Sequence, residues 1–251
     1  MRSGNPALNQ NTFALDVGSG AVVSGGDVMT LNGTVNKTGL MLLILVATAT
    51  FAWMQYAPEN PGAVMPYLVV GAIGGFILAI VTAFKKTWAP VTAPIYAALE
   101  GLFVGGISVW AEVQFPGIVM QAVFLTMGVL AALLMAYKSG LIKATENFKL
   151  GVVAATGGIA LLYLVNMGMR LFGFDGMPFI HEGSAMGIAF SVFVVIIAAL
   201  NLVLDFDFIE SGAEAGAPKY MEWYGAFGLT VTLVWLYIEI LRLLMKLQSR
   251  D

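Results

Sequence analysis

Seven uninterrupted apolar runs, each about 20 residues long, constrain this chain more than any other feature of its sequence. A transmembrane helix needs roughly 20 apolar residues to cross the hydrocarbon core of a bilayer, whereas barrel strands are shorter and alternate in polarity. The composition agrees, because 59% of the 251 residues are hydrophobic and 11% are charged, against about 25% charged in soluble domains. The sequence therefore predicts an all-α, polytopic membrane protein. The spans are placed at residues 39–56, 64–84, 90–109, 117–137, 148–169, 186–204 and 224–245.

The chain divides into a polar tail and one membrane domain. Residues 1–36 are rich in Gly, Ser, Asn and Thr and poor in aromatic residues, which is typical of a flexible tail. No apolar core follows Arg2 closely, so we do not expect a signal peptide. The connections PENPG, KKTWAP, FPG and KSG are too short to hold a second domain. Residues 37–251 are therefore expected to form a single seven-helix bundle, as a monomer.

Basic residues near the span ends favour a cytoplasmic N-terminus. This orientation leaves Arg170 as the one basic residue outside before the last span. It places the other basic residues of that part of the chain inside: Arg2, Lys37, Lys85, Lys86, Lys138, Lys143, Lys149 and Lys219. Seven spans then put the C-terminus outside, although Arg242, Lys246 and Arg250 cluster there. Either the last span is tilted or re-entrant, or the C-terminus stays inside; we expect it outside.

Composition also excludes several classes of function. The absence of cysteine rules out disulfides, thiol redox chemistry and thiolate metal sites. The single histidine, His181, argues against most zinc sites and catalytic triads, and we interpret it as a loop residue. A formal charge of -3 does not favour a nucleic-acid partner. We therefore expect no enzymatic activity and no cofactor, and a lipid bilayer as the main environment.

The informative residues are carboxylates inside or beside apolar runs. An ionisable group at mid-membrane depth costs about 2.5–3.5 kcal/mol on insertion scales, and such groups usually face the bundle interior. Glu100 lies near the centre of the third span, and is either a structural polar contact or part of a polar pathway. Asp205 and Asp207 end the sixth span and point to different sides of a helix, so at most one faces the core. We interpret Asp207 as a solvated helix end.

Glu239 lies inside the seventh span, and two interpretations of it remain open. Arg242, three residues later, is placed to form a local ion pair with it. Alternatively, Glu239 meets Asp205 across a helix interface, since consecutive helices usually lie side by side. Two carboxylates at one site cannot both ionise cheaply, so such a pair titrates as a unit and would act as a pH sensor. Ca²⁺ prefers hard oxygen ligands, which makes this pair a candidate Ca²⁺ site.

Several motifs resemble the Bax inhibitor-1 family. The run LYIE at 236–239, followed by ILRLL, is similar to the last-helix pattern of that family, in which Leu–aromatic–Leu–Asp precedes an apolar stretch. The run LDFDFI at 204–209 is similar to the end of its sixth helix, an Asp followed four residues later by Ile. PIYAALEGLFVG resembles its third helix, and SGNPAL with MTLNGTVNKTG resembles its bacterial branch. The resemblance covers most of residues 28–245.

The resemblance implies a bundle with the last helix at its centre and a pH-dependent Ca²⁺ leak. It assigns the carboxylate sensor to Asp205 and Glu239, and in some members a basic residue of the second helix pairs with the sixth-helix acid; Lys85 is the nearest candidate. The chain departs from the pattern in two places. Glu239 stands where the family usually has Asp, and SGAEAGAPKYMEW lengthens the segment between the two acids.

Three functions compete on this basis. The first is a pH-gated cation (Ca²⁺) leak channel, which several acids facing a core with few buried bases favour. Its residues are Asp205 and Glu239 as gate, with Glu100, Asp207, Arg242 and Lys85 as candidates for a polar pathway. The second is a non-conducting regulator of a membrane-protein partner, such as a membrane protease, acting through the tail. The third is a proton-coupled transporter, which would need broken helices and an internal repeat.

Overall fold

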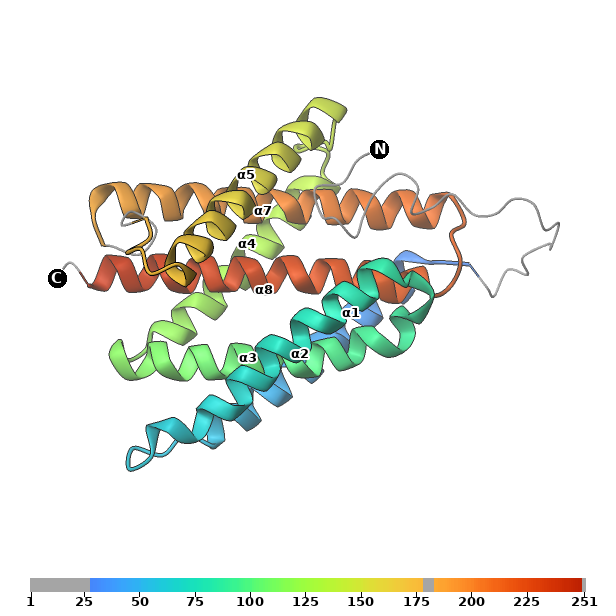
Figure 1. Cartoon of the computed structure of the whole chain (residues 1–251). Helices are drawn as coiled ribbons and strands as arrows, with labels where there is room; N and C mark the ends of the chain where they lie inside the picture. Colours follow the sequence, from blue (N-terminus) through green and yellow to red (C-terminus); the bar gives the residue numbers. More distant parts are fainter. Residues whose placement is uncertain (1–27, 178–182, 250–251) are drawn as a thin grey trace.

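The computed structural model describes residues 28–177 and 183–249. Within these ranges seven helices are long and apolar enough to cross a membrane, which confirms the predicted all-α, multi-pass architecture (Figure 1). Short 3₁₀ turns, Pro61–Val64 and Lys86–Trp88, precede the second and third of them. The seven helices are α1 (Leu31–Met54), α2 (Met65–Phe84), α3 (Ala89–Gln114), α4 (Ile118–Lys138), α5 (Glu146–Leu171), α7 (Ala185–Glu214) and α8 (Met221–Gln248).

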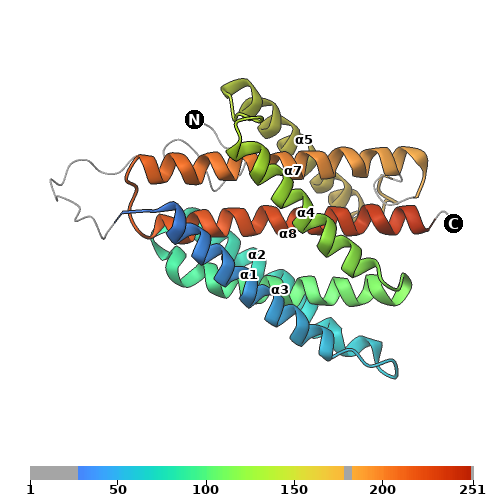
Figure 2. The same cartoon turned by 180° about the vertical axis from the view of Figure 1, so that it is seen from behind.

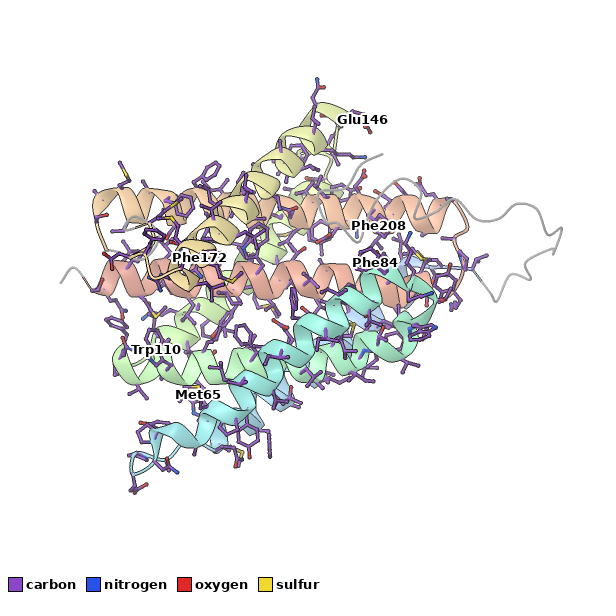
Figure 3. All side chains as sticks on the ribbon, in the orientation of Figure 1. Met65, Phe84, Trp110, Glu146, Phe172 and Phe208 are labelled. Atoms are coloured by element: carbon purple, nitrogen blue, oxygen red, sulfur yellow. The ribbon has the colours of Figure 1, made fainter. Side chains whose placement is uncertain are left out.

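Helix α8 is the centre of the bundle. It has the largest share of buried residues among the seven spans, and it contacts α1, α3, α4 and α7. Figures 1 and 2 show it running antiparallel to α7, with α4 and α5 crossing on opposite sides. In Figure 3, Phe84 and Phe208 lie toward the end of the bundle where α8 begins, and Met65, Trp110 and Phe172 lie toward the end where it finishes. We take these two ends as the two membrane surfaces.

Glycines allow α1, α2 and α3 to approach one another closely. A Cβ atom on Gly71 of α2 would lie 2.6 Å from the carbonyl oxygen of Leu99, and one on Gly105 of α3 would overlap the carbonyl oxygen of Ala49. Gly101 faces Leu45 of α1 in the same way. These contacts are between backbones, as expected for small residues spaced four apart in membrane helices. The glycine pairs of the sequence therefore serve close packing.

Helix α7 continues well beyond the predicted end of the sixth span at residue 204. It ends at Glu214 with Gly216 in a left-handed conformation (φ 64°). The amide of Ala217 donates to the carbonyl of Gly212, and that of Gly216 to Ala213, which is the Schellman arrangement. Asp205 therefore lies within the helix and not at its end, because the fall in hydropathy after Leu204 does not interrupt helical packing against α8.

Helix α1 begins eight residues before the predicted span at 39. Thr30 caps it by accepting from the amide of Gly33 at 3.0 Å. The preceding segment is also held, because Met29 is 2% exposed and its amide donates to the carbonyl of Ala217 at 2.6 Å. The predicted boundary between tail and bundle at 36 is therefore too late. Residues 1–27 of the predicted tail lie outside the described residues.

Glu222, in the first turn of α8, is the residue that fixes the early start of α1 at Leu31. Its carboxylate is fully buried and forms ion pairs with Lys37 of α1 and with Lys219, the latter at 2.9 Å. It also accepts hydrogen bonds from the backbone amide of Thr30 at 2.9 Å and from its hydroxyl at 2.8 Å. Gly33 gives the carboxylate its space, since a Cβ atom there would overlap it. We call this set of residues the Glu222 cluster.

Replacing Gly105 by Ala is expected to destabilise the bundle. The added methyl group meets the backbone of α1, so the two helices must separate, and overpacking of this kind costs about 1–3 kcal/mol. The matched control is Gly128→Ala on α4, where nothing lies within 4 Å; there the better helix propensity of Ala should be neutral or stabilising. Thermal unfolding in detergent measures both, and equal melting temperatures would refute the close packing of α1 on α3.

Glu222→Gln is expected to lower the melting temperature clearly. The amide cannot neutralise Lys37 and Lys219, and breaking a buried ion pair by removing one partner costs about 3–5 kcal/mol, less here because both lysines are partly exposed. Glu214→Gln is the control, since Glu214 is exposed at the end of α7 on the same membrane surface. A loss of stability no larger than that of the control would show that the Glu222 cluster does not hold α1 on α8.

Candidate functional site

Glu239 is buried near the far end of α8, at 2% exposure. Both of its oxygens accept hydrogen bonds from Arg242 Nη1 at 3.0 Å and from the hydroxyl of Tyr163 at 3.1 and 3.2 Å. Arg242 Nη1 also donates to the Tyr163 hydroxyl at 2.7 Å, and its guanidinium lies over the Tyr163 ring. These three residues, the Glu239 cluster, connect α8 to α5. The local ion pair with Arg242 is thus the interpretation that the structure confirms.

Asp205 is also buried, at 1% exposure, but the helix register places it at another depth. Phe208 of α7 stacks near Tyr224 of α8, with ring centroids 6.3 Å apart. At the other end, Lys246 of α8 donates to the hydroxyl of Ser191 of α7 at 2.9 Å.

Between these two contacts, Asp205 lies opposite the early part of α8 and Glu239 lies opposite the early part of α7. Asp205 and Glu239 are therefore separated along the helix axes by about ten residues, or about 15 Å at a rise of ~1.5 Å per residue. The expected direct contact between Asp205 and Glu239 is therefore wrong. The physical reason is the length of α7 beyond Asp205, which moves the turn to α8 further along the chain.

Glu100 lies on the inner side of α3. Its carboxylate faces α2 at Gly75, where an added Cβ atom would lie 2.7 Å from Oε2. Tyr96 lies one turn earlier on α3, and its ring packs edge-on against Phe227 of α8 with centroids 5.0 Å apart. Glu100 is half-buried and faces protein, at a depth close to that of Asp205.

The remaining candidates are located at the membrane surface where α8 begins. Asp207 forms an ion pair with Lys149 of α5 at 2.7 Å, so it is a paired helix residue and not a solvated helix end. Lys85 is exposed and ends α2. Its neighbour Lys86 reaches the central helix instead, with its ammonium 5.9 Å from the centroid of the Tyr224 ring.

Sequence reasoning missed several residues that the structure makes prominent. Lys149 and Lys246 are each 5% exposed, so the interior holds more basic groups than expected. Lys246 donates to the carbonyl of Gly187 at 3.0 Å as well as to Ser191. These contacts with α7 explain why a lysine lies at the end of α8 that is expected to face outside, where few basic residues are expected. The signal for Glu222 was its spacing of three residues from Lys219; Tyr163 gave no signal in the sequence. His181 lies outside the described residues.

The buried acids form a series along α8 and not a metal cage. Among the described residues no group of three or more His, Asp or Glu side chains is arranged to hold a metal ion. Glu222, Asp205 and Glu239 instead occupy three successive depths along the central helix. Single carboxylates at separate depths suit brief contacts with a passing cation better than retention of one ion, because firm Ca²⁺ binding uses six to eight oxygen ligands.

Comparison with known proteins agrees with this architecture. No match was found among curated proteins or among solved structures. The sequence profile of one family, described as Bax inhibitor 1 like, matches residues 5–249, which is nearly the whole chain and includes all seven helices and both ionic clusters. The chain is therefore an integral multi-pass membrane protein that belongs to the Bax inhibitor 1 like family.

Proposed function

We propose that this protein is a pH-sensitive leak pathway for cations, with Ca²⁺ as the cation transported. The observation that carries the proposal is the series of buried carboxylates, Glu222, Asp205 and Glu239, along the central helix. Ionisable residues within a membrane span are rare and typically mark ion pathways. Carboxylate oxygens are the ligands that Ca²⁺ prefers. Since the three acids lie at successive depths, a cation crossing along α8 meets an oxygen ligand at each stage.

The Glu239 cluster is the pH-sensitive closure in this proposal. Arg242 neutralises Glu239 and occupies the position that a cation would take, and Tyr163 ties both to α5. Protonation of Glu239 removes its negative charge and with it the attraction that holds Arg242. Helix α5 packs mainly on α7, and its described polar contact with α8 is this cluster. Acidification is therefore expected to loosen α5 from α8 and to increase the leak.

The protein is proposed to lie in a bacterial inner membrane with its N-terminus inside. Three exposed lysines at or near the α8-start surface support this orientation: Lys85, Lys138 and Lys143. Arg242 and Lys246 at the opposite surface bind within the bundle, to Glu239 and to α7. Because their charges are engaged there, they do not act as loop charges of the kind that sets topology.

A regulatory role through the N-terminus is the second candidate. The observation that favours it is the segment Val28–Thr30, which pairs with Pro218, donates to Ala217 and binds Glu222. A protein partner that pulled on the preceding residues would act directly on the start of α8. The two proposals differ in reconstituted liposomes without a partner, where a leak pathway conducts and a regulator does not.

Glu239→Gln is expected to raise Ca²⁺ flux at neutral pH and to flatten its dependence on pH. The glutamine carries no charge at any pH, so Arg242 is released under all conditions and acidification has nothing further to remove. The measurement is Ca²⁺ entry into liposomes loaded with an indicator dye, at pH 8 and about pH 6. Glu59→Gln, in an exposed loop, is the control. A wild-type pH profile in Glu239→Gln would eliminate this residue as the sensor.

The effects of Asp205→Asn and Glu239→Gln are expected to add. The residues lie about 15 Å apart along the helices, and substitutions more than about 7–10 Å apart with no shared partner usually combine independently. In a double-mutant cycle on Ca²⁺ flux, the change in the double variant should equal the product of the two single fold-changes. A double variant no different from the stronger single variant would show that the two acids act as one unit after all.

A further inference from the structure

An apolar groove separates α1 from α4 on one side of the bundle. Figure 2 shows both helices in front of α8, with α4 crossing it and α1 lying to one side of α4. The groove has a volume of about 560 Å³ and its floor is formed by α3 and α8. This volume is in the range of small-molecule sites, about 300–1,000 Å³. Its apolar walls and floor include Leu42, Val46, Val104, Val123, Met127 and Leu233. We call it the α1–α4 groove.

The groove extends over one leaflet of the bilayer. On α1 it runs from Leu42, at the middle of the helix, to Trp53, at its end. The eleven steps from Leu42 to Trp53 cover about 16 Å at a rise of ~1.5 Å per residue. Half of a hydrocarbon core of about 30 Å is about 15 Å. The length of the groove therefore equals the depth that one lipid acyl chain occupies, and the outer wall is exposed: Val46 is 59% and Val123 39% exposed.

The surface end of the groove carries the polar groups. Glu112, near the end of α3, and Trp53 both line it there. Glu112 accepts hydrogen bonds from the amides of Gly117 at 2.6 Å and Val119 at 3.1 Å, which hold its carboxylate at the start of α4. An ionised carboxylate has about four lone-pair positions, so it can accept further donors. An ammonium group is the complementary ligand, because it interacts with both the carboxylate and the indole face.

The floor of the groove is compatible with hydrocarbon although two hydroxyl groups lie on it. Ser108 of α3 and Tyr237 of α8 are hydrogen-bonded to each other at 2.6 Å, and the Ser108 hydroxyl is also 2.6 Å from the carbonyl oxygen of Val104. Hydroxyls satisfied in this way do not require water. An apolar chain can therefore lie directly on α8, the helix that carries the buried acids.

We propose that the α1–α4 groove binds one acyl chain of a phospholipid whose headgroup is a primary amine, with the ammonium at Glu112 and Trp53. The charge of Glu112 at the level of the headgroups selects the amine, and the length of the groove selects a chain that spans one leaflet. This site is independent of the leak proposed above, since it is defined by lipid binding and not by flux.

Native mass spectrometry of the full chain in detergent tests the proposal. Phosphatidylethanolamine and phosphatidylglycerol with identical acyl chains are added in turn, and the fraction of protein with one bound lipid is compared. The wild type is expected to prefer phosphatidylethanolamine by about two- to fivefold, the size expected of one partly exposed ion pair. Glu112→Gln is expected to abolish the preference while a lipid still binds.

Val123→Trp fills the groove from its exposed rim and is expected to remove the bound lipid. Val165→Trp is the matched control: Val165 is 44% exposed on α5, away from the groove, so lipid binding should be unchanged. Equal binding by Val123→Trp and the wild type would overturn the site. A preference of the wild type for phosphatidylglycerol, or no preference, would overturn the assignment of the headgroup.

Discussion

An ionised side chain inside a bilayer is costly unless the protein supplies its partner, and this constraint organises the interior of the bundle. Helix α8 carries Glu222 and Glu239, and each is bound by a cation three residues away in the sequence as well as by a residue of another helix. At one end Lys37 and Thr30 tie α1 to α8, and at the other Tyr163 ties α5 to α8. The two clusters therefore attach α1 and α5 to the central helix by ionic contacts.

Close packing and ionic contacts hold different parts of the bundle. Helices α1, α2 and α3 meet at glycines, where the backbones touch and no side chain intervenes. Helix α5 has no such close approach at Gly151, Gly157 or Gly158, where an added Cβ atom would meet nothing within 4 Å. Helices α1, α2 and α3 are in backbone contact, so one of them moves only if its whole interface with the others separates. Helix α5 depends more on polar contacts. This difference makes α5 the helix most able to respond to a change of charge.

The sequence predicted the spans well because length and apolarity are local properties. All seven predicted spans fall on observed helices. What it could not predict was register, which depends on where each helix ends. The continuation of α7 to Glu214 through LDFDFIESGAE is fixed by Gly216 and by packing on α8, and neither is visible as a change in hydropathy. Likewise, Thr30 begins α1 early because Glu222, nearly 200 residues later, binds it.

Register also determines how the acids can respond to protons. Two carboxylates in contact share one proton, and the pair then loses its protons in two separate steps that belong to both groups. Asp205 and Glu239 lie about 15 Å apart along the helices, so each responds to its own surroundings. For Glu239 those surroundings are the Arg242 guanidinium and the Tyr163 hydroxyl. In the proposed mechanism the closure opens when Arg242 and Tyr163 are released, and the depth of Asp205 makes it a separate proposed ligand for the cation.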